Sequence, residues 1–307
     1  MKEQNMTTHQ IDVAEVAYDA PMLVGECPLW QAAEQALYWV DIEGCAVHRL
    51  HPASGAHRAW KMASEPSALA RHADGGLVVA LRSGFARLDT DADDGAVTPL
   101  APAPYDTATT RFNDGRVDPA GRFWVGTIYE PRDKQAAQMF CLERGKLRLV
   151  WSGGMTVSNG LGFSPDQRTL YHADTTTHRI DRYPFDAATG ALGEAAEFKR
   201  FSTDKANHYG GRPDGAAVDS EGNYWCAMFE GGRVLCIAPD GTVLREVALP
   251  LRCPTMVAFG GEDLRTLYIT SASYKRSAEE LAAHPLSGCV LSLRVDVAGR
   301  IEPAYIG

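Results

Sequence analysis

Short runs of apolar residues, separated by turn residues, recur along the whole chain, whereas helical spacing of apolar residues is scarce. Six of these runs can be superposed on one another, each with one marker residue: Tyr38, Val78, Trp124, Tyr171, Trp225 and Tyr268. Successive markers are 40, 46, 47, 54 and 43 residues apart. A repeat of about 40–50 residues that contains only strands is typical of propeller blades with four strands each. The spacing therefore predicts an all-β fold, a six-bladed β-propeller with four-stranded blades, and buried positions for the markers.

Each marker run follows a turn, and each turn follows another apolar run. The clearest turns lie at 118–121, 164–166 and 219–222, where Asp, Gly and Pro favour reversal of the backbone. We therefore expect each repeat to begin with an inner strand and to return through the marker strand.

Residues near the two ends of the chain predict two elements outside the regular repeat. Residues 11–20 alternate enough to form a strand, which we expect to pair with the last blade and close the ring. Ser277 and Glu280 form an S-x-x-E capping box, which predicts one short helix that interrupts the last blade. No linker divides the chain, so we expect one domain over residues 11–307 and an extended or disordered segment over residues 1–10.

The superposed repeats also align a polar position near the start of each inner strand. The six residues there all carry a side-chain oxygen: Glu26, Ser67, Asn113, Asn159, Asp214 and Thr255. Because the inner strands of a propeller surround one channel, these oxygens are expected to face a common axis. Oxygen ligands suit hard divalent ions such as Ca²⁺, Mg²⁺ or Mn²⁺. The alignment thus predicts a central metal site, although each Asn-Gly or Asp-Gly pair alone is also an ordinary turn signal.

Composition narrows the possible roles of the chain. Its 307 residues carry a formal net charge of −9, which disfavours binding to nucleic acid or to anionic membrane surfaces. No apolar run is long enough to span a bilayer, and residues 1–20 have no basic segment followed by an apolar one, so neither a membrane span nor a secretory signal is expected. The seven cysteines are odd in number and form no C-x-x-C pair, which is typical of reduced thiols in the cytoplasm.

Four stretches around the aligned oxygens resemble one family, that of senescence marker protein (regucalcin), gluconolactonase and luciferin-regenerating enzyme. The matching stretches are 25–30 (GECPLW), 111–122 (RFNDGRVDPAGR), 158–166 (SNGLGFSPD) and 212–215 (RPDG). The resemblance covers essentially the whole chain. It implies a six-bladed propeller with one divalent cation in its channel, most simply Ca²⁺, with Zn²⁺, Mg²⁺, Mn²⁺ or Fe²⁺ as alternatives.

The resemblance also implies roles for particular residues. The metal-ligand pattern of the family falls on Glu26, Asn159 and Asp214, and Asn113 matches a residue that contacts substrate and can act as a further ligand. Arg111 matches a sugar-contacting arginine. Two more residues are expected near the substrate: Glu130, after the second strand of its repeat, and His208, which is otherwise a solvated loop residue.

The activity that the resemblance implies is hydrolysis of a small-molecule sugar lactone. The cation would polarise the lactone carbonyl and activate water. Asp214 is the expected proton relay, with Glu26 in reserve. A serine hydrolase is disfavoured because no G-x-S-x-G elbow occurs. Two alternatives stay open: a non-catalytic calcium-binding or regulatory propeller, and a hydrolase of another ester. The sequence leaves the lactone, the metal and the oligomeric state undetermined.

Overall fold

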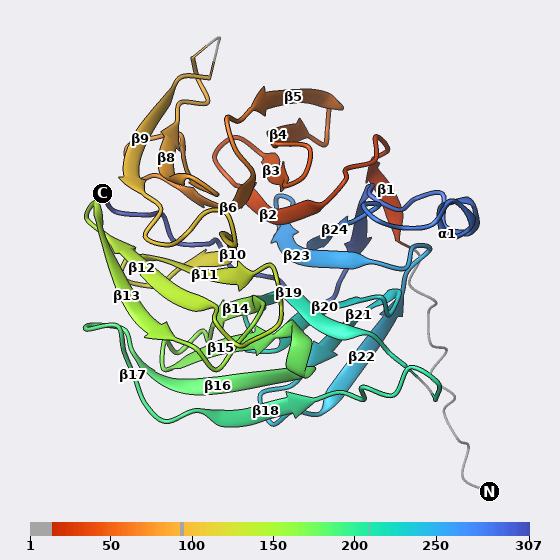
Figure 1. Cartoon of the computed structure of the whole chain (residues 1–307). Coiled ribbons are helices and arrows are strands. Elements are labelled where there is room, and N and C mark those ends of the chain that lie inside the picture. Colours follow the sequence, from red (N-terminus) through yellow and green to blue (C-terminus); the bar gives the residue numbers. More distant parts are fainter. Residues whose placement is uncertain (1–13, 93–94, 208) are drawn as a thin grey trace, which may run out of the picture.

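The computed structural model describes residues 14–92, 95–207 and 209–307, and over them it forms a ring of six antiparallel sheets (Figure 1). The inner strands are β2 (Gly25–Gln31), β6 (Pro66–Arg71), β10 (Thr110–Val117), β14 (Ser158–Phe163), β19 (Arg212–Val218) and β23 (Pro254–Gly260). The second strands are β3 (Ala36–Asp41), β7 (Leu77–Leu81), β11 (Phe123–Tyr129), β15 (Thr169–Asp174), β20 (Tyr224–Phe229) and β24 (Thr266–Ser271).

Two further strands complete each blade. The third strands are β4 (Ala46–His51), β8 (Gly84–Leu88), β12 (Gln138–Glu143), β16 (Arg179–Asp186), β21 (Arg233–Ile237) and β25 (Val290–Arg294). The outer strands are β5 (Ala56–Lys61), β9 (Val97–Pro102), β13 (Lys146–Ser152), β18 (Ala196–Arg200), β22 (Val243–Ala248) and β1 (Glu15–Tyr18). The fourth blade has an additional short strand, β17 (Ala191–Leu192), which pairs with the end of β16. The predicted six-bladed propeller is confirmed.

The marker residues lie in the core between the blades, as predicted. All six are at most 4% exposed. In two of the turns that precede them, an Asp side chain also accepts a hydrogen bond from the indole N–H of the marker. Asp118 accepts a hydrogen bond from the Trp124 indole at 2.8 Å, and Asp219 accepts one from the Trp225 indole at 2.9 Å. A buried indole N–H needs such a partner, so the Asp at the head of the turn fixes both the reversal and the orientation of the ring.

The ring is closed by the first described strand of the chain. β1 pairs with β25 in antiparallel fashion, with Glu15 opposite Ser292 and Val16 opposite Leu291. The predicted closing strand is therefore confirmed for its described part, whereas residues 11–13 and the segment predicted for residues 1–10 lie outside the described residues. The predicted helix is present as α1 (Ala278–Ala283), and the side chain of its N-cap, Ser277, accepts a hydrogen bond from the backbone N–H of Glu280. It lies between β24 and β25 in the last blade.

Every inner strand departs from regular pairing near its start. The register with the second strand shifts between Glu26 and Leu29, Pro66 and Ala68, Phe112 and Gly115, Asn159 and Gly162, Pro213 and Ala216, and Pro254 and Val257. A β-bulge re-aims the side chains beside it. Because each aligned oxygen-bearing residue lies at or beside one of these shifts, the bulges determine how the aligned side chains meet the channel.

The chain ends in a segment that we call the C-terminal strap, residues 300–306. Arg300 donates a hydrogen bond to the carbonyl of Phe163 at the end of β14, and Arg116 near the end of β10 pairs with Glu302. Tyr305 is 1% exposed, and its hydroxyl accepts a hydrogen bond from the backbone N–H of Gly145 at 2.7 Å. The C-terminus accordingly lies beside the third blade (Figure 1). The strap therefore crosses the ends of inner strands that are opposite to the aligned oxygens.

Two further expectations concern the class of protein. All seven cysteines fall within the described residues and are free thiols. Among the described helices, none has both the length and the apolar character needed to cross a bilayer. The cytoplasmic location stays a prediction.

Candidate functional site

The starts of the inner strands surround a cavity of about 490 Å³ at one mouth of the channel. Its lining includes six of the seven candidate site residues: Glu26, Arg111, Asn113, Glu130, Asn159 and Asp214. They come from blades 1, 3, 4 and 5, so residues that are up to 188 positions apart in the sequence share one space. His208, the remaining candidate, lies outside the described residues.

Two of the six aligned oxygens have structural partners instead. The hydroxyl of Ser67 donates to the carbonyl of Ala80 at 3.2 Å, and Ser67 does not line the cavity. Thr255 lines the cavity, but its hydroxyl donates to the carbonyl of Gly25. These hydroxyls satisfy backbone groups at the bulges, which leaves the carboxylates and carboxamides as the candidate ligand set.

Three buried carboxyl groups lie within electrostatic reach of one another around the channel. Burial, and then the charges of Asp214 and Asp114, raise the pKa of Glu26 well above its ordinary value. Burial, and then the charge of Asp114, raise the pKa of Asp214. Burial also raises the pKa of Asp114 to about 6. Each carboxylate thus lacks sufficient positive charge nearby, which is the environment that a bound cation would stabilise.

Asp114 was not among the residues predicted from the sequence. It follows Asn113 within the bulge of β10, and one of its oxygens accepts a hydrogen bond from the backbone N–H of Leu161 at 2.9 Å. Its other oxygen, Oδ1, is buried and has no hydrogen-bond partner among the described residues. The alignment of repeats singled out its neighbour Asn113 as the one position in this blade, and in the structure both polar residues lie in β10.

The two carboxamides are linked directly across the blades. The side-chain N–H₂ of Asn113 donates to Oδ1 of Asn159 and to the carbonyl of Ser158, both at 2.8 Å. Asn159 in turn donates to the hydroxyl of Thr175 at 2.7 Å, and this hydroxyl donates to the carbonyl of Pro213 at 2.8 Å. The network connects blades 3, 4 and 5 and holds both amide side chains in defined orientations.

The donor set fits an oxygen-preferring divalent cation. Within the described parts of the chain no three His, Cys, Asp or Glu side chains gather as a metal cluster, so the candidate set consists of two carboxylates, Glu26 and Asp214, with two carboxamides, Asn113 and Asn159. The adjacent thiol of Cys27 is an unsuitable ligand because burial raises its pKa to about 12. Carboxylate and amide oxygens are preferred by Ca²⁺, Mg²⁺ and Mn²⁺.

Arg111 and Glu130 meet the cavity from blade 3. Arg111 is buried, and its Nη1 donates to the side-chain oxygen of Asn113 at 2.8 Å. Both oxygens of Glu130 accept hydrogen bonds from Arg82, at 2.9 and 2.8 Å. Although burial opposes it, this pairing lowers the pKa of Glu130. Arg111 can therefore place a donor beside the candidate metal ligands, whereas Glu130 is already engaged by a neighbouring blade.

A second acidic residue, Glu230, lies just after the second strand of blade 5. Glu130 follows β11 and Glu230 follows β20, each the second strand of its blade. Glu230 contacts three cationic side chains, Arg212 at 3.3 Å, Arg276 at 3.4 Å and Lys205 at 3.5 Å. It also lines the cavity. Sequence reasoning missed it, and the repeat gives no signal for it, because Glu230 aligns with Tyr129 and not with Glu130.

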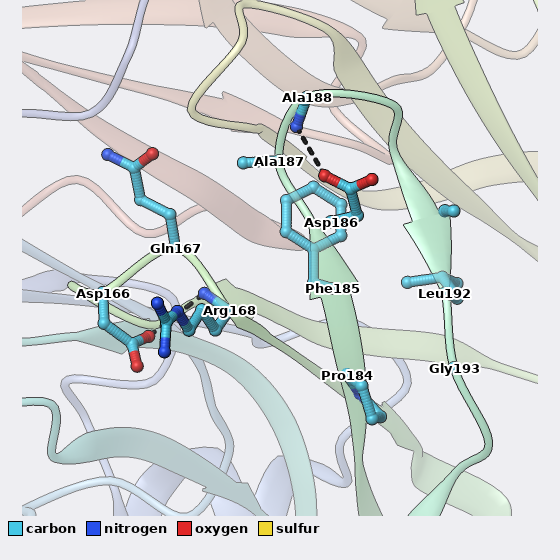
Figure 2. Close-up of a pocket in the computed structure, with 11 residues that line it drawn as sticks. Asp166, Gln167, Arg168, Pro184, Phe185, Asp186, Ala187, Ala188, Leu192 and Gly193 are labelled. Carbon is cyan, nitrogen blue, oxygen red and sulfur yellow. Dashed lines mark hydrogen bonds between the residues drawn. The ribbon is translucent and has the colours of Figure 1, made fainter.

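A larger hollow, of about 680 Å³, lies at the opposite end of the fourth blade (Figure 2). Its two carboxylates belong to separate turns and are occupied there: Asp166 accepts from the backbone N–H of Arg168 at 3.1 Å, and Asp186 from that of Ala188 at 3.0 Å. Both hydrogen bonds are local turn contacts. No set of side chains converges in this hollow as the oxygens do at the mouth, so we place the candidate site at the mouth.

Comparison with known proteins is consistent with this geometry. The profile of the SMP-30/Gluconolactonase/LRE-like region matches residues 24–273. The chain is 50% identical to 6-deoxy-6-sulfogluconolactonase from Pseudomonas putida over 94% of this chain and 96% of that one. It is 35% identical to pentonolactonase XacC from Haloferax volcanii over 83% of each chain. The crystal structure of a calcium-binding protein, regucalcin, from Agrobacterium tumefaciens superposes with a TM-score of 0.90 at 32% identity, covering 96% of this chain and 97% of that one.

Proposed function

The chain belongs to the SMP-30/gluconolactonase/LRE-like family, and from this membership we propose that it hydrolyses a sugar lactone with one divalent cation bound in the channel. The observation that carries the proposal is the meeting of Glu26, Asn113, Asn159 and Asp214 in one cavity. These four residues would hold the cation, for which Ca²⁺ is our first choice. When bound, such a cation would supply Lewis acidity toward the lactone carbonyl and toward the attacking water.

The side chains of the cavity supply the other requirements of ester hydrolysis. Asp214 is the side chain to which we assign the proton of the attacking water, because it is a buried carboxyl group that lines the same cavity as the other candidate ligands. Glu26 shares this environment and is the alternative proton acceptor. Arg111, positioned by its hydrogen bond to Asn113, donates to the hydroxyl groups of the sugar and orients the ring.

The relatives suggest which lactones to examine. One is named for a sulfonated gluconolactone and another for a pentonolactone. We therefore propose both a six-carbon lactone, with or without a sulfonate group, and a five-carbon lactone as candidate substrates.

The proposal is tested by removing and restoring the metal. Protein stripped with a chelator is expected to lose hydrolysis of glucono-1,5-lactone, followed by acid release, and to recover it when Ca²⁺ is added. Mg²⁺, Mn²⁺, Zn²⁺ and Fe²⁺ in parallel samples identify the preferred ion. Full activity in the metal-free protein would contradict the proposed role of the cation.

A second candidate function is calcium binding without catalysis. It is favoured by the similarity to a structure described as a calcium-binding protein. Calorimetric binding of Ca²⁺ together with no hydrolysis of any lactone, with any of these metals, would support it. Turnover of a simple aryl ester but of no lactone would instead support hydrolysis of another ester.

A further inference from the structure

The charge of the cavity differs from that of the chain as a whole. The chain has a net charge of −9. The cavity lining instead contains equal numbers of acidic and basic residues: Glu26, Glu43, Glu130, Asp214 and Glu230 against Arg111, Arg132, Arg212, Lys275 and Arg276. A divalent cation at the proposed site would make the lining net positive. A positive, partly enclosed space attracts anionic ligands.

The positive charge is concentrated on the side of blades 5 and 6. There Lys205, Arg212 and Arg276 share the single carboxylate of Glu230, and Arg276 also contacts Glu280 at 3.4 Å. Arg252 pairs with Glu280 as well, at 3.1 Å, and Lys275 lines the cavity beside them. Of the described side chains that line the cavity here, Arg212, Lys275 and Arg276 are cationic, and Glu230 is the one carboxylate besides the candidate metal ligand Asp214.

On the side of blade 3 the positive and negative charges are closer to equal. Arg82 pairs with both Glu65 and Glu130, and Arg111 lies 3.6 Å from Glu130. Arg132 lines the cavity, and its side chain has no ion pair with a described residue. Of the side chains that line the cavity here, Arg111 and Arg132 are cationic and Glu130 is a carboxylate, so an anionic ligand would find the larger excess of positive charge near Glu230.

Arg212 has unused hydrogen-bonding capacity at this place. Its guanidinium lies over the ring of Phe229, 5.2 Å from the ring centroid, and its Nε is buried with no hydrogen-bond partner among the described residues. A buried guanidinium N–H without a partner is unfavourable unless a ligand accepts from it. Arg212 is also two residues before Asp214 in β19, so an anion bound to it would be beside the candidate metal ligands.

We propose that the substrate is a lactone with an anionic group away from its carbonyl, and that Arg212 and Arg276, assisted by Lys275, bind that group. The inference rests on the proposed function. Sulfonate, phosphate and carboxylate groups share the required chemistry, since each presents several acceptor oxygens to a guanidinium. Glu230 is a positioning residue, because its carboxylate holds both arginines at the cavity wall.

The test compares charged and neutral lactones with the full chain in the presence of Ca²⁺. The substrates are glucono-1,5-lactone and its 6-sulfonate, 6-phosphate and 6-carboxylate counterparts. We expect kcat/KM for at least one charged lactone to exceed that for the neutral one by about tenfold or more, and this preference to fall in about 0.5 M salt. A kcat/KM that is equal or higher for the neutral lactone would overturn the inference.

Variants locate the anion site. Arg212→Gln and Arg276→Gln should each lower the charged-to-neutral preference by about tenfold, mainly through KM for the charged lactone. Arg200→Gln is the control, since Arg200 is exposed, pairs with Glu197 and does not line the cavity, and it should keep the preference. If Arg212→Gln fails to fold, Arg276→Gln decides. An unchanged preference in the folded variants would overturn the assignment.

A binding measurement separates this inference from the proposed function. Calorimetric titration with 6-sulfogluconate and with gluconate, the two ring-opened products, does not require turnover. Tighter binding of the sulfonated product by a protein that hydrolyses no lactone would keep the anion site and refute the catalytic proposal. Hydrolysis of lactones combined with equal binding of both products would keep the catalytic proposal and refute the anion site.

Discussion

The side-chain amide of Asn113 donates a hydrogen bond to Oδ1 of Asn159 at 2.8 Å, across 46 positions of sequence and between two blades. The same oxygen of Asn159 is the one that a cation would need. The hydrogen bond thus orients a candidate ligand from the neighbouring blade, as outer partners of metal ligands generally do.

Replacement of Asn159 tests this relationship. Asn159→Ala removes a candidate ligand and leaves the amide of Asn113 without one acceptor, so we expect Ca²⁺ affinity to fall by at least about tenfold and stability by about 1–3 kcal/mol. Calorimetric titration and urea unfolding measure the two effects. Asn207→Ala, at an exposed loop position, serves as the control. Unchanged Ca²⁺ affinity in Asn159→Ala would remove this residue from the ligand set.

The role of Asp214 is separable from its contribution to the fold. Asp214→Asn keeps the size of the side chain but cannot accept a proton, so kcat is expected to fall by about 100-fold or more. Circular dichroism should show an intact propeller. Asp240→Asn, which changes an exposed turn carboxylate, should retain activity. Near-normal kcat in Asp214→Asn would transfer the proton-relay role to Glu26.

Replacement of Glu26 should have opposite effects on the stability of the metal-free and of the metal-bound protein. Its carboxylate is buried with the charges of Asp214 and Asp114, so Glu26→Gln should raise the melting temperature of chelated protein. The same variant should lose most of the increase that Ca²⁺ produces in the parent protein. Scanning calorimetry with chelator and with Ca²⁺ gives both values, with exposed Glu262→Gln as the control. A Glu26→Gln variant that is less stable than the parent without metal would contradict the repulsion described here.

The dependence of stability on pH should contain a contribution from a buried histidine. Burial, and then the charge of Arg179, lower the pKa of His172 to about 3, and its Nε2 lies 2.9 Å from the hydroxyl of Ser158. The unfolded chain binds a proton here below about pH 6.5 and the folded chain does not, so stability falls as the pH drops from 6.5 toward 3.

The size of this contribution follows from the two pKa values. Between pH 7 and pH 5 it amounts to about 2 kcal/mol for His172. Urea unfolding of the parent and of His172→Gln at both pH values measures it, and the variant should lose less stability than the parent on acidification. Equal losses in both proteins would show that the native state takes up the proton at this histidine.

The C-terminal strap should contribute to stability through Tyr305. Tyr305→Ala empties a fully buried aromatic position and should lower the free energy of unfolding by about 3 kcal/mol or more. Tyr305→Phe removes only the hydrogen bond from Gly145 and should cost about 1 kcal/mol. Ile306→Ala, at a position that is 54% exposed, should change stability little. If Tyr305→Ala and Ile306→Ala behave alike, the strap does not stabilise the ring.

Local patterns in the sequence were sufficient to predict the elements of the fold. The recurring strands, the turns headed by Asp118 and Asp219, and the cap at Ser277 each depend on residues that are close in the chain. The aligned oxygens could also be found, because the repeat brings one position per blade to the same mouth. The alignment could not show which of these oxygens face the cavity and which, like that of Ser67, instead form a hydrogen bond with a backbone carbonyl.

The missed residues depend on contacts between blades. Arg82 forms hydrogen bonds with Glu130, which is 48 positions away in the sequence, and Glu230 forms ion pairs with cationic residues of blades 5 and 6. Neither arrangement has a characteristic spacing, since loop conformations set the distances. Asp114 was missed for a different reason: the alignment singles out one position per blade, and Asp114 lies one residue after the aligned Asn113, within the bulge of β10.

The pairing of β1 with β25 also has a consequence for biosynthesis. The last blade takes its outermost strand from the first part of the chain to be translated and its other three strands from the last part. Earlier blades can assemble while the ribosome is still elongating the chain, but β1 must wait for its partner, residues 290–294, to emerge. A nascent chain stalled before that point would expose an unpaired strand, and is the species that we expect chaperones to recognise.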